Sequence, residues 1–357
     1  MSNLIIDPTT KIYSRYTNKE NELLKSKLKQ YYNCSNIAIT NSGLHANFLS
    51  INIILQTNKI NNIIYINELY HESINLIKSF ELSNTVNIHN INILDNDLII
   101  NLFKSDQLLN RSNILFIESC TNPNGYIFNF ELIPILKSLS DKLFIICDNS
   151  WLTNYIFNPF EHDIDIITIS LTKYYSGGNA ICGACLIKDN LLHNKLDNYI
   201  RITGIHISPL QISIINSNID LTFNRLIKSS NLTLQIINYI ESLNYNIQIN
   251  HPYVNKLIIN LTKKYFKNNL YPSTFAFGIK IDKDILLDIL DKLSILLIET
   301  SFGSKLTILD NHIYTINDYS FIRISIGYED TIDRIILGLN ELFNLIKSHI
   351  KLNKSNF

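Results

Sequence analysis

The chain contains 357 residues, with 31 basic and 31 acidic side chains and no formal net charge; that length fits roughly two domains of ~150 residues each. A balanced charge excludes a general attraction to nucleic acid or to an anionic membrane, so binding has to come from a local site. The chain opens without a basic segment followed by an apolar one, and no apolar run approaches the ~18 residues of a membrane span. We therefore expect a cytosolic protein.

The cysteine content also argues against a secreted, disulfide-rich protein. Five cysteines, an odd number in a long chain, are typical of reduced thiols. Cys182 and Cys185 form a C-x-x-C pair, but the apolar residues around them predict a strand, in which positions three apart face opposite sides. With no second Cys or His pair nearby, we expect no metal site.

The first half of the chain alternates between two apolar patterns. After an N-terminal arm, helical spacing predicts a helix over residues 20–32. Short apolar runs then predict strands at 37–40, 63–66, 114–117, 143–147 and 164–169, and helical spacing predicts helices at 44–55, 73–79 and 131–139. This alternation predicts an α/β fold with a mostly parallel sheet covered by helices on both faces. Ligands of such sheets bind at the carboxyl ends of the strands.

The second half predicts a separate, smaller α/β domain. A long helical pattern runs from Pro209 to about residue 242, followed by predicted strands at 274–281, 295–299 and 321–325 and helices at 284–293 and 331–350. We predict an N-terminal arm and helix over 1–32, a large domain over 33–215 and a small domain over 216–357. The sequence contains no internal repeat and no glycine-rich dinucleotide or Walker loop.

A lysine and a carboxylate follow two of the predicted strands. Asp148 ends the strand at 143–147, and Lys173 follows the strand at 164–169 across a short turn. Pyridoxal phosphate chemistry requires this pairing, because the lysine amine forms a Schiff base and the carboxylate keeps the pyridine nitrogen protonated. Taken alone, a lysine after a strand is more often a solvated turn residue.

Small and hydroxyl-bearing residues supply a candidate phosphate site. Ser42, Gly43 and Leu44 lie between a predicted strand and a predicted helix, where backbone amides at a helix N-terminus attract an anion. A simple N-cap by Ser42 would explain these residues equally well. Ser170 and Thr172 add two hydroxyls that could bind the same phosphate.

These positions resemble the pyridoxal-phosphate enzymes of cysteine and methionine metabolism, the family of cystathionine γ-synthase, cystathionine γ-lyase, cystathionine β-lyase, methionine γ-lyase and O-acetylhomoserine sulfhydrylase. The matching fragments occur in order along nearly the whole chain. They are Tyr13-Ser14-Arg15, Ser42-Gly43-Leu44, Tyr70, Glu118-Ser119-Cys120-Thr121-Asn122-Pro123, Cys147-Asp148-Asn149-Ser150, Ser170-Leu171-Thr172-Lys173-Tyr174, Ser301-Phe302-Gly303 and Arg323-Ile324-Ser325-Ile326-Gly327-Tyr328-Glu329-Asp330. Each fragment is weak alone, and the eight together identify the family.

The resemblance implies a pyridoxal 5'-phosphate transferase fold of type I, with a role for each matching residue. Lys173 would bind the cofactor and move the substrate proton, and Asp148 would hold the ring nitrogen. Tyr70 would stack on the ring and assist proton transfer. The cofactor phosphate would be bound by Ser42, Gly43, Leu44, Ser170 and Thr172.

The resemblance also implies how the substrate and a second subunit take part. Arg323 would bind the substrate α-carboxylate through its two-pronged guanidinium. Ser301 and Asn122 would orient that carboxylate and the ring hydroxyl. Tyr13 and Arg15 would reach the cofactor phosphate of a neighbouring subunit, so a homo-oligomer with a shared active site is expected, acting on a small sulfur amino acid.

Three functional hypotheses stay open from sequence. A carbon–sulfur lyase would release a thiol, a 2-oxo acid and ammonia, whereas a transferase would replace an activating group on homoserine with a sulfur nucleophile. A cofactor-binding protein without turnover is the third, because residues 17–20 and 71–72 depart from the family pattern. We favour the lyase, because Ile12 and Thr300 stand where several cystathionine-handling members have acidic residues.

Overall fold

The computed structural model describes residues 18–83, 86–243 and 245–354. Tyr13, Arg15 and Ile12, to which the sequence assigns roles, lie outside these described residues. The chain divides into two compact units, which are described separately here. Unit 1 comprises Met1–Cys120 and Phe128–Asp220, and unit 2 comprises Thr121–Ile127 and Leu221–Phe357. The short segment 121–127 therefore belongs to the second unit although both of its flanks belong to the first.

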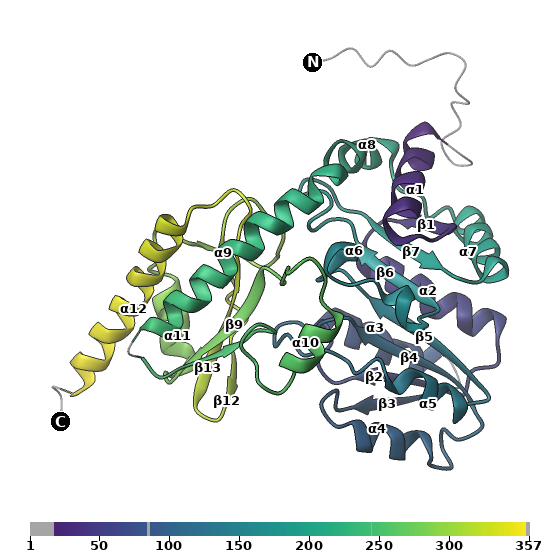
Figure 1. The fold of residues 1–357 in the computed structure, drawn as a ribbon, viewed down its shortest axis with the longest axis horizontal. Coiled ribbons are helices and arrows are strands. Elements are labelled where there is room, and N and C mark those ends of the chain that lie inside the picture. The colour runs from purple at the N-terminus through teal and green to yellow at the C-terminus, as the bar shows by residue number, and fades with distance from the viewer. Residues whose placement is uncertain (1–17, 84–85, 244, 355–357) are drawn as a thin grey trace. The chain divides into compact units, whose positions relative to one another are not determined.

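Unit 1 alternates strands and helices along most of its length (Figure 1). Its strands are β1 (Asn36–Thr40), β2 (Asn62–Ile66), β3 (Asn87–Ile91), β4 (Ser112–Glu118), β5 (Lys142–Asp148), β6 (Ile166–Ser170) and β7 (Gly183–Ile187). Its helices are α1 (Lys19–Tyr32), α2 (Gly43–Thr57), α3 (His71–Ser83), α4 (Asn96–Phe103), α5 (Leu132–Ser138), α6 (Thr153–Ile156), α7 (Asn190–Thr203) and α8 (Pro209–Asn218), with short 3₁₀ turns at Pro159–His162 and Ile219–Leu221.

The sheet of unit 1 is mostly parallel, as the sequence predicts. Its strands, within the described residues, run in the order β1-β7-β6-β5-β4-β2-β3. All neighbouring pairs are parallel except the two that β7 makes with β1 and β6. The central strands β2 and β4 are almost entirely buried because both faces are covered, which explains their continuous apolar sequence.

Unit 2 contains a smaller, largely antiparallel sheet. Its strands are β8 (Ile247–Asn250), β9 (Thr274–Ile279), β10 (Leu297–Ile298), β11 (Ile308–Leu309), β12 (Tyr314–Ile316) and β13 (Tyr319–Ser325), and its helices are α9 (Thr222–Ser242), α10 (Ile259–Tyr265), α11 (Lys283–Leu290) and α12 (Ile332–Lys354). The strand path is β10-β11-β13-β9-β8, with β12 paired to β13.

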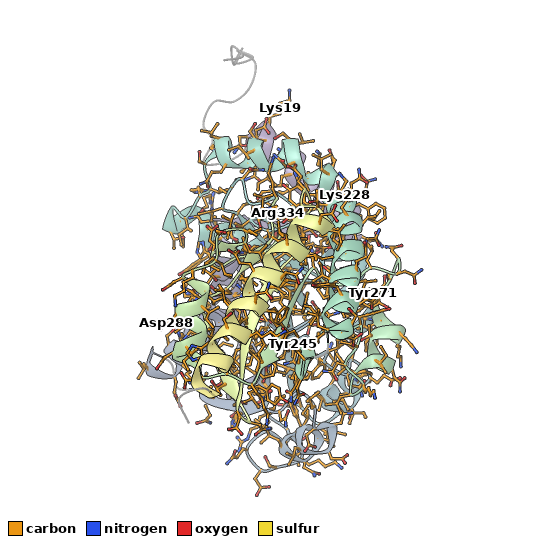
Figure 2. The ribbon with its side chains drawn as sticks, turned by 90° about the vertical axis from the view of Figure 1, so that its left-hand side faces the viewer. Lys19, Lys228, Tyr245, Tyr271, Asp288 and Arg334 are labelled. Carbon is orange, nitrogen blue, oxygen red and sulfur yellow. The ribbon has the colours of Figure 1, made fainter. Side chains whose placement is uncertain are left out.

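Two long helices cover the core of unit 2. Figure 2 shows α12, in yellow, beside α9, and contacts between the two helices agree with that view. Tyr245, labelled there, stacks on Phe343 of α12 with ring centroids 5.3 Å apart. Apolar side chains of both helices meet Phe275 and Phe277 of β9 in one buried cluster. The helices thus bury one face of the small sheet.

Two expectations for individual elements are wrong. The helical pattern from Pro209 to residue 242 is two helices, separated by the 3₁₀ turn Ile219–Leu221. The break has a tertiary cause: Asp220 accepts hydrogen bonds from Lys27 Nζ and Tyr31 Oη of α1, each at 2.6 Å. The strand expected at 295–299 is reduced to the two residues of β10.

The segment between residues 80 and 113 contains two elements, β3 and α4, that the sequence analysis left unassigned. Strand β3 carries polar side chains at Asn87, His89 and Asn90 and lies at the edge of the sheet, so it lacks the apolar alternation of a half-buried strand. Among the described residues, no helix is both long and apolar enough to cross a membrane.

Candidate active site

Unit 1 brings the predicted lysine and carboxylate to neighbouring strand ends. Strands β4, β5 and β6 are parallel, with Glu118 paired to Asp148 and Asp148 paired to Thr168. Ser170 ends β6, and Lys173 follows three residues later in a turn. The pairing register therefore places Asp148 at the same edge of the sheet as the turn that carries Lys173.

Asp148 is held by neutral donors on both of its oxygens. The Asn47 side-chain amide donates to Oδ2 at 3.0 Å, and the backbone amide of Ser150 donates to Oδ1 at 2.9 Å. Burial raises the pKa of Asp148, and the hydrogen bonds from Ser150 and Asn47 only partly offset that rise. A cationic partner would satisfy this carboxylate further, and a protonated pyridine nitrogen is such a partner.

Asn47 reaches Asp148 from the inner face of α2. Its side chain is 1% exposed, and its amide also lies 3.2 Å from the Ser73 hydroxyl. Its Oδ1 atom is buried and has no hydrogen-bond partner among the described residues. A buried amide oxygen without a donor is costly. The orientation that leaves this oxygen unpaired is the one that directs the NH₂ group at Asp148.

The start of α2 lies against the end of β6, as a phosphate cradle requires. Ser42 caps the helix by accepting from the His45 backbone amide at 3.1 Å. A Cβ added to Gly43 would lie 2.7 Å from Ser170 Cβ, and one added to Gly183 would lie 2.2 Å from the Ser42 carbonyl oxygen. Glycine is therefore needed at both positions for the backbone of α2 to approach β6 and β7 this closely.

Two hydroxyl groups link the turn that carries Lys173, and the strand end before it, to other segments of the same chain. Ser150 Oγ accepts from the Ser170 backbone amide at 2.7 Å. This bond links the loop that follows Asp148 to the end of β6. Thr172 Oγ1 donates to the Cys182 carbonyl at 3.2 Å and accepts from the Cys182 amide at 3.0 Å. Because the Thr172 hydroxyl proton is already used, binding a phosphate with it would require that proton to turn away from Cys182.

Tyr70 stands at the N-terminus of α3 and is 45% exposed. Its backbone amide donates to Glu118 Oε1 at 2.7 Å, and its carbonyl accepts from the amides of Ser73 and Ile74. Glu118, at the end of β4, thus fixes where Tyr70 leaves the backbone. An exposed ring at this edge fits the predicted stacking role, which stays a prediction.

Unit 2 contains a polar cluster around Arg323 on β13. Arg323 Nη1 donates to Asn122 Oδ1 at 3.1 Å, and Nη2 donates to Thr300 Oγ1 at 3.2 Å and to the Ser301 carbonyl at 3.5 Å. Arg323 Nη2 also forms an ion pair with Asp310 Oδ2. The three predicted substrate-binding residues therefore lie together, and a carboxylate of the protein itself joins them.

Asp310 is enclosed by donors. The side chain is 6% exposed, Thr300 Oγ1 donates to its Oδ2 at 3.0 Å, and the His312 amide donates to its Oδ1 at 2.9 Å. Burial acts to raise the pKa of Asp310, but the Arg323 charge and these hydrogen bonds outweigh it and hold the pKa below its ordinary value. Asp310 is therefore ionised at neutral pH.

Sequence reasoning missed the roles of Asn47, Ser150 and Asp310. Asn47 lies four residues after Gly43, hence on the same face of α2, and is a polar residue among buried apolar ones. Asp310 ends an apolar run in the same way. A polar residue that interrupts a buried pattern was the available signal, but it does not identify the partner.

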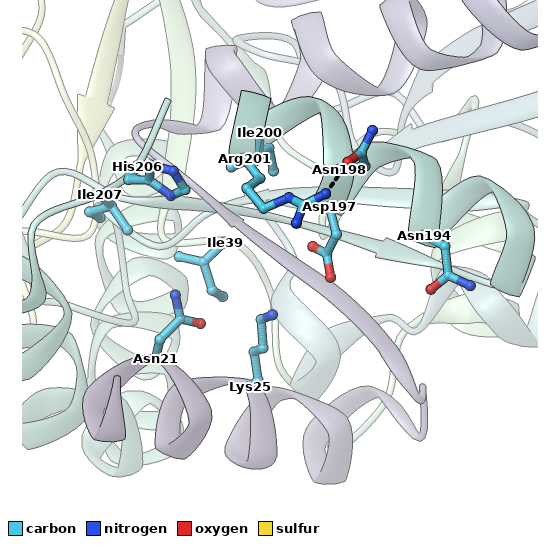
Figure 3. A pocket seen from close by; sticks show the side chains of 10 residues that line it. All are labelled: Asn21, Lys25, Ile39, Asn194, Asp197, Asn198, Ile200, Arg201, His206 and Ile207. Carbon is cyan, nitrogen blue, oxygen red and sulfur yellow. Dashed lines mark hydrogen bonds between the residues drawn. The ribbon is translucent and has the colours of Figure 1, made fainter. Parts of the chain in front are cut away.

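The remaining candidates in unit 1 do not join this chemistry. All five cysteines are buried and none forms a disulfide, and burial raises the pKa of Cys182 and Cys185. Between α1 and α7 lies a crevice of about 310 Å³, shown in Figure 3, and none of the predicted site residues that the structure describes lines it. Figure 3 shows Lys25, Arg201 and Asp197 extending into it, so it is a mixed-charge surface feature.

The residues of unit 1 fit pyridoxal phosphate by two independent observations. Asp148 is a partly buried carboxylate that accepts hydrogen bonds from the neutral amides of Asn47 and Ser150, as a pyridinium partner should. The glycine-dependent junction of α2 and β6 places a helix N-terminus beside Ser170, which suits a phosphate. Lys173 supplies the amine three residues after Ser170.

Comparison with known proteins gives the same family. The model of the Cys/Met metabolism PLP-dependent enzyme family matches residues 5–348. Curated relatives include an L-alanine/L-glutamate racemase of Wolbachia pipientis, 23% identical over 65% of this chain, and a cystathionine beta-lyase of Schizosaccharomyces pombe, 22% identical over 67%. The match covers 60% of the length of each of these two relatives.

Solved structures of this family share the fold. An O-acetylhomoserine (thiol)-lyase from Campylobacter jejuni, which carries a pyridoxyl-lysine phosphate, superposes with a TM-score of 0.79 at 23% identity, covering 92% of this chain and 87% of the other. A cystathionine gamma synthase from Xanthomonas oryzae gives 0.82 at 17% identity, covering 94% and 88%. The predicted fold class is confirmed, and the chain belongs to the Cys/Met metabolism family of enzymes whose cofactor is pyridoxal 5'-phosphate.

Proposed function

We propose that this protein is a carbon–sulfur lyase that converts a small sulfur amino acid and water into a thiol, a 2-oxo acid and ammonia. The observation that carries this proposal is the support of Asp148 by Asn47 and Ser150 at the strand edge that leads to Lys173. Bound there, the cofactor would supply an electron sink that makes the substrate Cα–H acidic. Elimination begins with loss of that proton.

Each residue then has a defined task. The Lys173 amine would hold the cofactor until the substrate amine displaces it, and the freed amine would accept the Cα proton and deliver a proton to the departing sulfur. Asp148 would keep a positive charge on the cofactor nitrogen, and Tyr70 would stack on the ring. In unit 2, Arg323 binds the substrate carboxylate, with Asn122 and Ser301 beside it.

The curated relatives favour elimination over replacement. Besides the cystathionine beta-lyase, they include an L-methionine gamma-lyase of Porphyromonas gingivalis, 28% identical over 29% of this chain. Thr300 also supports a substrate whose distal end carries less charge. Its hydroxyl already donates to Asp310 and accepts from Arg323. Replacement on an activated homoserine uses the same groups and is the alternative that the experiment has to exclude.

The deciding experiment offers the purified holoenzyme methionine, cystathionine, cysteine, or O-acetylhomoserine with sulfide. The 2-oxo acid and the homocysteine formed from O-acetylhomoserine and sulfide are measured separately, and loss of optical rotation of L-alanine is followed in parallel. Formation of 2-oxo acid without sulfide supports the lyase. Homocysteine without 2-oxo acid indicates a transferase, racemised alanine alone indicates a racemase, and no product with a yellow, cofactor-loaded protein indicates loss of turnover.

We further propose that the active enzyme is a homo-oligomer in which Tyr13 and Arg15 bind the cofactor phosphate of a neighbouring subunit. The proposal is supported by the Tyr13-Ser14-Arg15 sequence. Mixing Arg15→Ala subunits with Lys173→Ala subunits should restore part of the activity that each variant lacks. Absence of complementation in verified mixed oligomers would contradict a shared site.

A further inference from the structure

The predicted carboxylate-binding arginine already binds a carboxylate of its own chain. Nη2 of Arg323 has two hydrogens and three acceptors within reach, namely Asp310 Oδ2, Thr300 Oγ1 and the Ser301 carbonyl. Both partners are largely buried, with side chains 11% and 6% exposed. Little water is therefore present to screen the attraction between them.

Asp310 is placed for this contact by the surrounding chain. It follows β11, which pairs with β13, and its backbone amide donates to the Arg323 carbonyl at 2.9 Å. His312 and Thr300 hold the two carboxylate oxygens in place. The pair thus rests on sheet register and on hydrogen bonds to both oxygens.

A second carboxylate at Arg323 meets two obstacles. It must compete for hydrogens that Nη2 already donates, and it brings a negative charge close to the ionised Asp310. Like charges in a poorly hydrated site repel one another. An arginine without such a partner would offer its full charge to the substrate.

We propose that Asp310 is a specificity-determining residue that offsets the charge of Arg323 and weakens the binding of substrate carboxylates. The inference rests on the proposed role of Arg323 in substrate binding. The substrate class it predicts is an amino acid bound with low affinity through its carboxylate, whose selection depends more on its amine and side chain. The second carboxylate of a dicarboxylic amino acid gains no binding affinity from the Arg323 subsite.

The test uses propionate, a carboxylate that has no amine and cannot react with the cofactor. Its dissociation constant for the holoenzyme is measured by ligand-observed NMR, for wild type and for Asp310→Asn. We expect Asp310→Asn to bind propionate roughly tenfold more tightly, the low end of what a hydrogen bond between charged groups contributes. Asp318→Asn, the same change at an exposed acid of unit 2, should leave the affinity at the wild-type value.

Two further variants keep the test decisive if Asp310→Asn does not fold. Thr300→Val removes the hydroxyl that joins Arg323 to Asp310 and should tighten propionate binding about threefold, whereas Thr300→Ser should not change it. Adding Arg323→Gln to either tightened variant should abolish the gain. An unchanged propionate affinity in folded Asp310→Asn, or equal affinities for Thr300→Val and Thr300→Ser, would overturn the proposal.

Turnover gives a second, separable readout. With any amino acid that proves to be a substrate, Asp310→Asn should lower KM by a similar factor and leave kcat nearly unchanged, because the effect is on binding. Failure of every amino acid to react would contradict the proposed lyase and leave the propionate result intact. A fall in kcat with unchanged propionate affinity would show that Asp310 has a structural role instead.

Discussion

Replacing Asn47 by alanine tests whether the buried amide on α2 supports Asp148. The substitution removes a 3.0 Å hydrogen bond to a carboxylate, and such bonds contribute about 1.5–3 kcal/mol. No described residue donates to the Asn47 side-chain oxygen, so loss of that oxygen should cost nothing. We therefore expect the pKa of Asp148 to rise further, because the hydrogen bond from Asn47 is one of the contacts that lower it.

Weaker ionisation of Asp148 should weaken its hold on a protonated cofactor nitrogen. We expect the dissociation constant for pyridoxal phosphate, measured by titrating apoprotein and following Trp151 fluorescence, to rise by roughly tenfold. Asn52→Ala is the same truncation on the same helix, at a side chain whose oxygen accepts from Gln56, and it should change the dissociation constant less than about twofold.

A double-mutant cycle separates this effect from general loosening of α2. If Asn47 acts through Asp148, then Asn47→Ala should have little further effect on cofactor affinity in an Asp148→Asn background. Equal cofactor affinities for Asn47→Ala and Asn52→Ala would refute the reasoning. An undiminished effect of Asn47→Ala in the Asp148→Asn background would show that it acts by another route.

Three other changes have expected outcomes. Lys173→Ala should remove the yellow colour of the purified protein and all turnover, read by absorbance and by 2-oxo acid release, because no other amine replaces the covalent link. Gly183→Ala places a Cβ 2.2 Å from the Ser42 carbonyl oxygen; the start of α2 must then move, and cofactor affinity should fall at least about tenfold, with the free energy of unfolding lower by about 1–3 kcal/mol. An unchanged titration would contradict the cradle. His251 is fully buried and its pKa is lowered to about 4 by burial, so the unfolded state, with the ordinary value of 6.5, binds its proton first as the pH falls. Between pH 8 and pH 5 this should remove about 2 kcal/mol of stability, measured by urea unfolding, and His251→Gln should abolish that part of the pH dependence.

Much of the fold followed from apolar patterning, and the exceptions have physical causes. Strands β4, β5 and β6 are buried on both faces, so their apolar runs predict them from the sequence. Strand β3 does not, because at the sheet edge its polar side chains need no burial. The break between α8 and α9 depends on the contact of Asp220 with α1, which no local pattern contains.

Candidate site residues could be predicted where the chemistry requires a particular residue type in a local sequence context. They could not be predicted where a residue acts only because the fold brings it close to another. A Schiff-base lysine, a carboxylate after a strand and glycines at a helix start each have a local sequence context. Asn47 and Asp310 act on residues 101 and 13 positions away. Their partners are set by strand order and register, which the sequence of one chain does not reveal.

The two charges to which we assign functions, Asp148 and Arg323, have opposite kinds of support within the protein. Asp148 is held by an amide side chain and a backbone amide, which orient it without neutralising it. Arg323 is held by a full counter-charge, Asp310, which orients it and also cancels its field. Neutral support leaves a charge available to an incoming partner, whereas an ion pair makes the partner compete. The expected consequence is a cofactor bound strongly through its ring nitrogen and a substrate carboxylate bound weakly. Asp310→Asn would give Arg323 neutral support, and Asn47→Lys would give Asp148 a counter-charge. Together these two changes should reverse the order of the two affinities.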